Sequence, residues 1–165
     1  MQGPDPFIEL IPIAEATGAR KELYDDLERV RGKGHVSNLF KAYGAFPELR
    51  IANFKRLTVL LSQGTLSAKL KEAVMTALAV INHCDYCISF HGTQMQSVGS
   101  SDEEIAAARD FDAERIKFTT KERALFEYAM KANGDPHSIT PEDIIVCRDI
   151  GVTDAEFVEI IETVN

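Results

Sequence analysis

The chain has 165 residues, with 45% hydrophobic and 27% charged side chains, which is ordinary for one globular domain and argues against a disordered chain. Lysine and arginine together number 18 against 26 aspartates and glutamates, so the formal net charge is −8. Because phosphate binding needs clusters of lysine and arginine, nucleic acid and anionic membrane surfaces are excluded as expected partners.

The chain carries no predicted membrane span or leader sequence. Its longest apolar stretch, residues 73–81, is interrupted by Thr76 and is far too short to cross a bilayer. The N-terminal residues Met1–Asp5 provide no basic region ahead of an apolar run, which a secretory signal would need. We therefore expect a cytoplasmic protein.

The first half of the chain predicts helices, taken in order. Leucines and a valine at helical spacing indicate a helix over residues 23–30, and Ser37 precedes a second, short one. Pro47 suits the first turn of a third helix, which Gly64 ends. The next segment, residues 66–81, is apolar on nearly all sides, which is typical of a buried helix.

The second half of the chain repeats one helix-start signal. A serine or threonine is followed three residues later by an acidic residue, or directly by proline. These starts lie at Ser101, Thr119, Thr140 and Thr153. No segment alternates with a period of two, and no Asn-Gly or Asp-Gly turn occurs. We expect an all-α, single-domain chain of about seven or eight helices.

Cys84, Cys87 and His91 form a group of side chains that could carry out a reaction. On a helix the two cysteines share one face, and the imidazole lies one turn beyond Cys87. If the pair opens a helix, the unpaired N–H groups and the positive end of the dipole stabilise a thiolate, and the imidazole can accept the thiol proton. Asn82, a residue type common at helix starts, precedes the pair. Since such cysteines can pass between dithiol and disulfide with little backbone movement, the spacing predicts a two-electron redox site.

Two other interpretations of this constellation stay open. Cys84 and Cys87 could be core residues beside a satisfied histidine, since free cysteine is often buried and inert. They could also bind zinc together with His91, with or without His83. Zinc ligands, however, usually come as two separated pairs, and this sequence has no second pair.

Two further titratable residues are less conspicuous. Glu72 is expected from its position alone to be solvated or to pair with a helix dipole, although the apolar helix that carries it could bury it. Cys147 lies in an apolar helical stretch and is expected in the core.

Glu72, the run Cys84-Asp85-Tyr86-Cys87 and His91 together resemble the signature of the alkylhydroperoxidase D and carboxymuconolactone decarboxylase superfamily, in its peroxidase-related branch. The resemblance extends from about Val36 to the end of the chain, so residues 1–35 are expected to be an N-terminal extension and residues 36–165 the core. It implies a single alkylhydroperoxidase D-like helical domain that assembles into homo-oligomers, either trimers or hexamers.

The resemblance also implies an activity and roles for the site residues. Redox members of the superfamily reduce small hydroperoxides without a bound cofactor or metal and are recycled by a dithiol carrier protein. By motif position, Cys87 would attack the peroxide, Cys84 would resolve the sulfenic acid, and Glu72 and His91 would relay the proton. We therefore expect a cysteine-based hydroperoxide reductase. The alternatives are a redox-responsive dithiol protein without peroxide turnover and a small zinc site.

Two details qualify these roles. Tyr86 stands where the best-described alkylhydroperoxidases have a histidine, and with a pKa of about 10 a tyrosine is a poor base at neutral pH. Two alternatives therefore stay open: a weaker peroxidase activity, or a substrate other than the usual alkyl hydroperoxides. A helix start favours a low pKa for Cys84, whereas the spacing of His91 favours Cys87 as the nucleophile, and we follow the histidine. Decarboxylase activity is not expected, because that branch typically lacks the cysteine pair.

Overall fold

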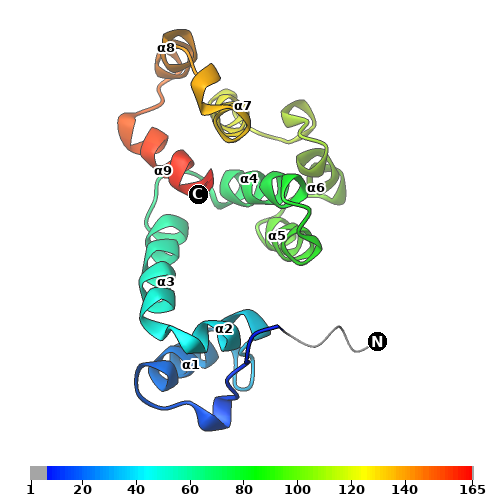
Figure 1. The fold of residues 1–165 in the computed structure, drawn as a ribbon. Helices are drawn as coiled ribbons and strands as arrows, with labels where there is room; N and C mark the ends of the chain where they lie inside the picture. The colour runs from blue at the N-terminus through cyan, green and yellow to red at the C-terminus, as the bar shows by residue number, and fades with distance from the viewer. Residues whose placement is uncertain (1–6, 165) are drawn as a thin grey trace. The chain divides into compact units, whose positions relative to one another are not determined.

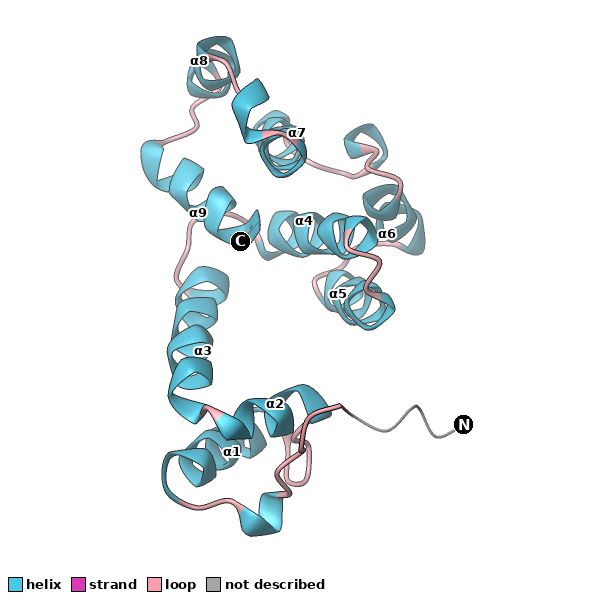
Figure 2. Cartoon of the chain, in the orientation of Figure 1, coloured by secondary structure: helices cyan, strands magenta, loops and turns pink. Residues whose placement is uncertain are grey.

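The computed structural model describes residues 7–164, and in that range all regular structure is helical, with nine α-helices and four short 3₁₀ helices (Figures 1 and 2). The all-α prediction is confirmed, and the expected number of helices was slightly low. No helix within residues 7–164 combines the length and apolar character that a membrane span requires. The expectation drawn from Met1–Asp5 lies outside the described residues.

The chain groups into two compact units, the first ending at Val59 and the second beginning at Leu60. The prediction of a single domain with residues 1–35 as an extension stays a prediction. The first unit holds α1, α2 and most of α3, which span Gly18–Arg31, Asn38–Ala42 and Pro47–Ser62. Its core is built from side chains of α1, α2 and the segment between them: Leu23, Tyr24, Leu27, Val36 and Phe40.

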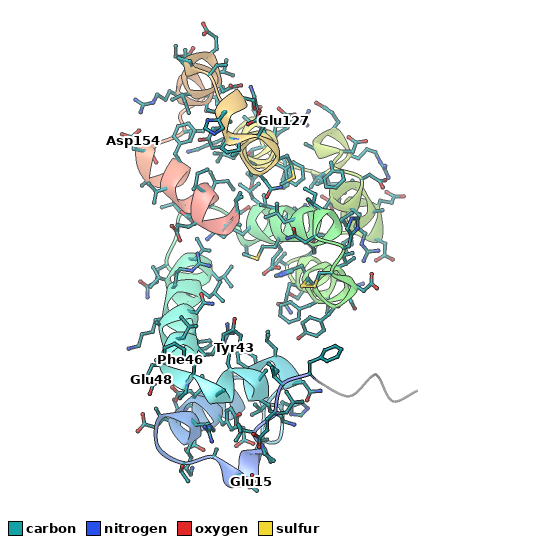
Figure 3. All side chains as sticks on the ribbon, viewed as in Figure 1. Glu15, Tyr43, Phe46, Glu48, Glu127 and Asp154 are labelled. Atoms are coloured by element: carbon teal, nitrogen blue, oxygen red, sulfur yellow. A yellow bond between two sulfur atoms is a disulfide. The ribbon has the colours of Figure 1, made fainter. Side chains whose placement is uncertain are left out.

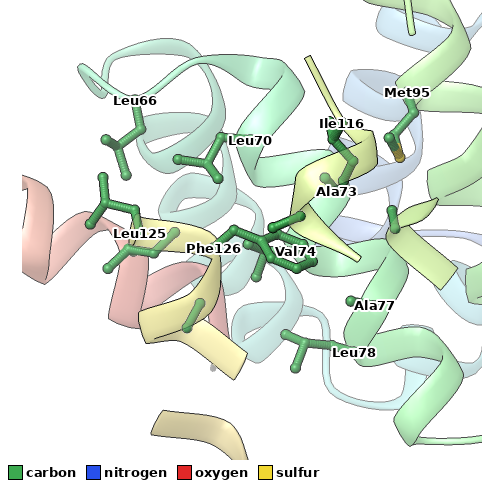
Figure 4. Close-up of a cluster of buried hydrophobic side chains, with 14 of the residues drawn as sticks. Leu66, Leu70, Ala73, Val74, Ala77, Leu78, Met95, Ile116, Leu125 and Phe126 are labelled. Carbon is green, nitrogen blue, oxygen red and sulfur yellow. The ribbon is translucent and has the colours of Figure 1, made fainter. Parts of the chain in front are cut away.

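The second unit is organised around α4, which spans Ala68–Ile81. This helix packs against α5 (Asp85–Ser97), α6 (Asp102–Arg109), α7 (Thr120–Gly134) and α9 (Asp154–Val164). Leu70, Val74 and Ala77 of α4 are completely buried, and they form a cluster with Leu125 and Phe126 of α7 (Figure 4). The prediction of a buried helix is confirmed, because neighbours cover α4 on several sides.

The predicted helix starts are formed by side-chain caps. Ser101, Thr119 and Thr140 each accept a hydrogen bond from the third helical residue, whose carboxylate accepts one from the cap's own N–H. Thr153 and Glu156 make the same reciprocal pair before α9. These caps begin α6, α7, α8 (Pro141–Asp149) and α9. Each satisfies N–H groups that a helix start otherwise leaves unpaired.

The buried Lys71 links the segment before α4 to α9 through an ion pair and a hydrogen bond. The side chain of Lys71 is 1% exposed, and its Nζ lies 2.6 Å from Glu159 Oε1 and donates to the Leu60 carbonyl at 2.6 Å. The Glu159 carboxylate also accepts the Leu66 N–H. A Cβ added to Gly64 would lie 1.8 Å from Glu159 Oε1, so glycine is needed where the chain passes this carboxylate. The sequence reasoning missed Lys71, because its partner Glu159 lies far along the chain.

A second buried ion pair holds α4 to the segment around α6. The side chain of Glu104 is 4% exposed and lies 2.5 Å from Lys69 Nζ. Burial alone would raise the pKa of Glu104. Hydrogen bonds from Lys69 and from the backbone N–H groups of Ser101 and Lys117 outweigh burial and lower its pKa to about 2.

This depressed pKa predicts part of the acid sensitivity of the fold. A carboxylate whose folded pKa lies below its unfolded value contributes stability above the unfolded pKa, and that stability is lost as the pH falls through the folded pKa. We expect Glu104→Gln to be less stable than the wild type near neutral pH, by about 2 to 3 kcal/mol, and the two to converge near pH 2. Chemical denaturation between about pH 7 and pH 2 measures this difference, with the exposed neighbour Glu103→Gln as control. If the free energies of unfolding of Glu104→Gln and the wild type differ by the same amount at every pH, the lowered pKa of Glu104 is contradicted.

Candidate redox site

The turn between α4 and α5 brings the cysteine pair to the start of a helix. Asn82 ends α4, and His83 follows in the left-handed region with φ of 52°. The N–H of His83 donates to the Val80 carbonyl, and the N–H of Cys84 donates to the Ala79 carbonyl, each at 3.0 Å. This is the Schellman pattern, in which glycine usually takes the left-handed position. Asn82 therefore caps the end of α4 and does not begin the helix of the cysteines.

Cys84 itself is the N-cap of α5. Its Sγ accepts a hydrogen bond from the N–H of Cys87 at 3.3 Å. The two sulfurs are joined as a disulfide, with Cα atoms 5.2 Å apart, and the sulfur–sulfur bond is drawn in yellow in Figure 3. Both residues are partly exposed. The prediction that the pair opens a helix is confirmed, and the pair has the geometry needed for a reversible disulfide.

Glu72 and His91 meet where α4 packs against α5. Nδ1 of His91 lies 2.8 Å from Oε2 of Glu72, and their side chains are 21% and 11% exposed. Of the two expectations for Glu72, burial on the apolar helix is the one the structure shows. Because the carboxylate accepts the hydrogen bond from Nδ1–H, Nε2 is left as the ring nitrogen that can take a proton. His91 lies one helical turn beyond Cys87, as its spacing predicts.

One aromatic ring contacts this histidine and is itself stacked on a second ring. Tyr86 and Phe90 lie one turn apart on α5, with ring centroids 6.2 Å apart and ring planes within 10° of parallel. The Phe90 ring also meets the His91 ring edge-on, at a centroid distance of 5.2 Å. The sequence reasoning singled out Tyr86 only as a departure from a motif and missed Phe90. Two aromatic residues four apart on a predicted helix were the signal that could have found the pair.

The described residues give no support to the zinc interpretation. Within residues 7–164, no three histidine, cysteine, aspartate or glutamate side chains are grouped so as to hold a metal ion. Cys147 is buried on α8, as expected. Burial raises the pKa of the Cys147 thiol, and the carboxylates of Asp143 and Glu127 raise it further. Cys147 is therefore a poor nucleophile at neutral pH.

Comparisons with known proteins place these residues in a family context. The model of the carboxymuconolactone decarboxylase family matches residues 47–131, a span that contains Glu72, Cys84, Cys87 and His91. No curated protein matches the chain.

Two solved structures are similar to the chain along nearly its whole length. The alkylhydroperoxidase AhpD core of an uncharacterized peroxidase-related protein from Ralstonia eutropha JMP134 has 21% identity and a TM-score of 0.73, over 97% of this chain and 82% of that one. An uncharacterized peroxidase-related protein from Silicibacter sp. TM1040 has 20% identity and a TM-score of 0.77, over 99% and 85%. At such identities the likeness shows the fold, and it confirms the predicted alkylhydroperoxidase D-like architecture.

Proposed function

The chain belongs to the carboxymuconolactone decarboxylase family, and from that premise we propose that it is a cysteine-based hydroperoxide reductase. The observation that carries the proposal is the Cys84–Cys87 disulfide at the start of α5, one turn from a histidine held by a buried glutamate. A thiol pair that can be oxidised reversibly and a base oriented by a carboxylate are the two parts that peroxide reduction by cysteine requires.

The proposed reaction has three balanced steps. His91 Nε2 takes the thiol proton of Cys87, and the thiolate attacks one oxygen of the hydroperoxide. The S–O bond forms, the O–O bond breaks, and the leaving alkoxide recovers the proton as the alcohol. Cys84 then attacks the Cys87 sulfenic acid, which forms the disulfide and releases water. An external dithiol reduces the disulfide and is itself oxidised, so two electrons pass from the dithiol to the hydroperoxide.

The assignment of the two cysteines rests on their different surroundings. His91 follows Cys87 by one turn on the same face of α5. Cys84 receives the Cys87 N–H at the positive end of α5, which stabilises it as a leaving thiolate when the reductant attacks Cys87. The cap at Cys84 also favours a thiolate there, so the two features point to different attacking residues, and we follow the histidine in assigning Cys87 as the attacking residue and Cys84 as the resolving one.

The proposal includes partners and a location. The substrate is a small hydroperoxide, the reductant is a dithiol protein, and a reducing compartment such as the cytoplasm keeps the pair reduced between turnovers. We also propose a homo-oligomer, either a trimer or a hexamer. Exposed apolar side chains on α8 and α9 support self-association: Ile145, Val146 and Val158, which are 51%, 58% and 65% exposed. A single chain in solution, measured by light scattering, would contradict it.

A stoichiometric titration tests the function. Fully reduced protein is mixed with one equivalent of cumene hydroperoxide, and disulfide and alcohol are quantified. We expect one mole of cumyl alcohol and one mole of Cys84–Cys87 disulfide per mole of chain. Cysteine oxidised to sulfinic acid in place of the disulfide, or alcohol formed without the disulfide, would contradict the proposed cycle.

The tyrosine at position 86 favours a second candidate function. If peroxide turnover requires a base at this position, tyrosine cannot supply it. The cysteine pair would then act as a redox-responsive dithiol, and disulfide formation would change a binding surface. Disulfide formation that is reversible, but no faster with hydroperoxide than that of free cysteine, would favour this second function.

A further inference from the structure

We propose that the second unit binds a small monocarboxylate in a hollow between α5 and α6. The hollow has a volume of about 300 Å³ and is lined by residues of these two helices, which pack against each other (Figure 1). Its polar side chains are Ser89, Thr93, Gln96, Asp102 and Arg109, and Gly92 and Ile105 complete the lining. The inference goes beyond the proposed function, because it names another site and another ligand.

Arg109 gives the hollow its positive charge. It is the only cationic residue among the described residues that line the hollow. The acidic side chains that follow it along the chain, Asp110 and Asp112, lie 3.2 Å and 4.0 Å from Arg115 instead. Within residues 7–164 no carboxylate forms an ion pair with Arg109. Its guanidinium is therefore available, and its planar fork of N–H donors matches the two oxygens of a carboxylate.

Gly92 determines where this guanidinium lies. A Cβ added to Gly92 would lie 3.0 Å from Nη2 of Arg109 and 3.5 Å from Cγ2 of Ile105. The guanidinium therefore rests against the backbone of α5, beside two residues that are buried. Glycine is less favourable than alanine inside a helix, and the tight contact that an alanine would make here is with Arg109. The missing side chain thus leaves room for the guanidinium at the bottom of the hollow.

Asp102 limits the charge of the ligand. Its carboxylate lines the same hollow and accepts a hydrogen bond from Gln96 Nε2 at 3.5 Å. Because like charges brought together at a binding site cost affinity, an anion with two negative charges is disfavoured next to this carboxylate. A monocarboxylate places its single charge on Arg109, and the hydroxyl of Ser89 is a further donor in the lining. The hollow therefore fits a carboxylate better than a phosphate dianion.

The hollow lies on a different side of α5 from the redox groups. Consecutive residues are about 100° apart around a helix, so Ser89 lies about 200° from Cys87, whereas His91 lies only about 40° from it. A carboxylate bound at Arg109 therefore does not cover Cys87. The proposed site is a second ligand site and not a part of the peroxide site.

A titration of the oxidised wild type with sodium pentanoate tests the site. Backbone N–H signals are followed by NMR, and we expect saturable shifts centred on Ser89, Thr93 and Arg109. Inorganic phosphate at the same ionic strength should bind at least about tenfold more weakly, and Asp102→Asn should remove most of this difference. No saturable shift at these residues, equal affinity for both anions in the wild type, or an unchanged difference in Asp102→Asn would overturn the proposal. No hydroperoxide is present, so the result is independent of turnover.

Three variants connect the binding to the hollow. Arg109→Gln removes the charge and should raise the dissociation constant for pentanoate by at least about tenfold. Gly92→Ala should raise it by about threefold or more, because the added methyl group displaces the guanidinium, yet should melt at or above the wild-type temperature. Arg115→Gln changes an arginine outside the hollow and, as the matched control, should bind like the wild type. Unchanged binding in Arg109→Gln, or an equal loss in Arg115→Gln, would contradict the site.

Discussion

Cys87→Ser is expected to lose hydroperoxide turnover by at least about 10³-fold, because a serine hydroxyl cannot replace a thiolate as the nucleophile. Cys84→Ser should also lose turnover under a dithiol reductant, but for another reason. In that variant Cys87 still attacks the peroxide, and its sulfenic acid persists because the resolving thiol is absent. Mass spectrometry after dimedone trapping should therefore find a sulfenic acid in Cys84→Ser and none in Cys87→Ser.

The third cysteine provides the matched control for these variants. Cys147 is buried on α8, and burial raises the pKa of its thiol, so Cys147→Ser should keep wild-type turnover. Sulfenic acid trapped in Cys87→Ser, with none in Cys84→Ser, would reverse the roles of the pair. Full activity in Cys87→Ser would reject the proposed mechanism altogether.

The second large effect is expected at the proton relay. His91→Asn removes the base that takes the Cys87 proton, and we expect kcat to fall by about 10² to 10³-fold. Glu72→Gln keeps a hydrogen-bond acceptor 2.8 Å from His91 Nδ1 but removes the charge that stabilises the protonated ring, so a smaller loss of about tenfold or more is expected. Steady-state kinetics of the folded variants measures both effects.

A control is needed because Glu72 is buried. Glu127→Gln alters an exposed glutamate on α7, labelled in Figure 3, and should leave kcat unchanged. Circular dichroism establishes whether Glu72→Gln and His91→Asn fold like the wild type. If both variants fold and turn over at the wild-type rate, Glu72 and His91 are structural and another group must move the proton.

The parts of the fold that depend only on residues close together in the sequence could be predicted. Capping boxes at Ser101, Thr119 and Thr140 fix helix starts through contacts within one turn. The shared face of Cys84 and Cys87 likewise follows from their spacing along one helix. These features need no knowledge of the rest of the chain.

The remaining features depend on contacts between distant segments. Glu72 and His91 are 19 residues apart, and only the packing of α4 on α5 makes Glu72 a buried partner of a histidine. Lys71 is paired with Glu159, which lies much further along the chain. The turn at His83 was also missed, because histidine at a left-handed position carries none of the usual sequence signal that glycine provides. A local pattern cannot report such pairings.

The helix α4 explains why the site has this form. Its apolar sides anchor it among α5, α6, α7 and α9, so Glu72 is held on a rigid element. The turn that follows places Cys84 at the N-terminus of α5, where the disulfide forms. One buried helix thus positions both the carboxylate and the sulfur pair.

The most direct measurement is the rate at which fully reduced wild-type protein consumes cumene hydroperoxide under a dithiol reductant, compared with an equal concentration of free cysteine. We expect repeated turnover at least about 10²-fold faster than free cysteine, as acid–base assistance from His91 and Glu72 predicts. A rate equal to that of free cysteine, from a protein whose disulfide still forms and is reduced, would contradict the proposed reductase.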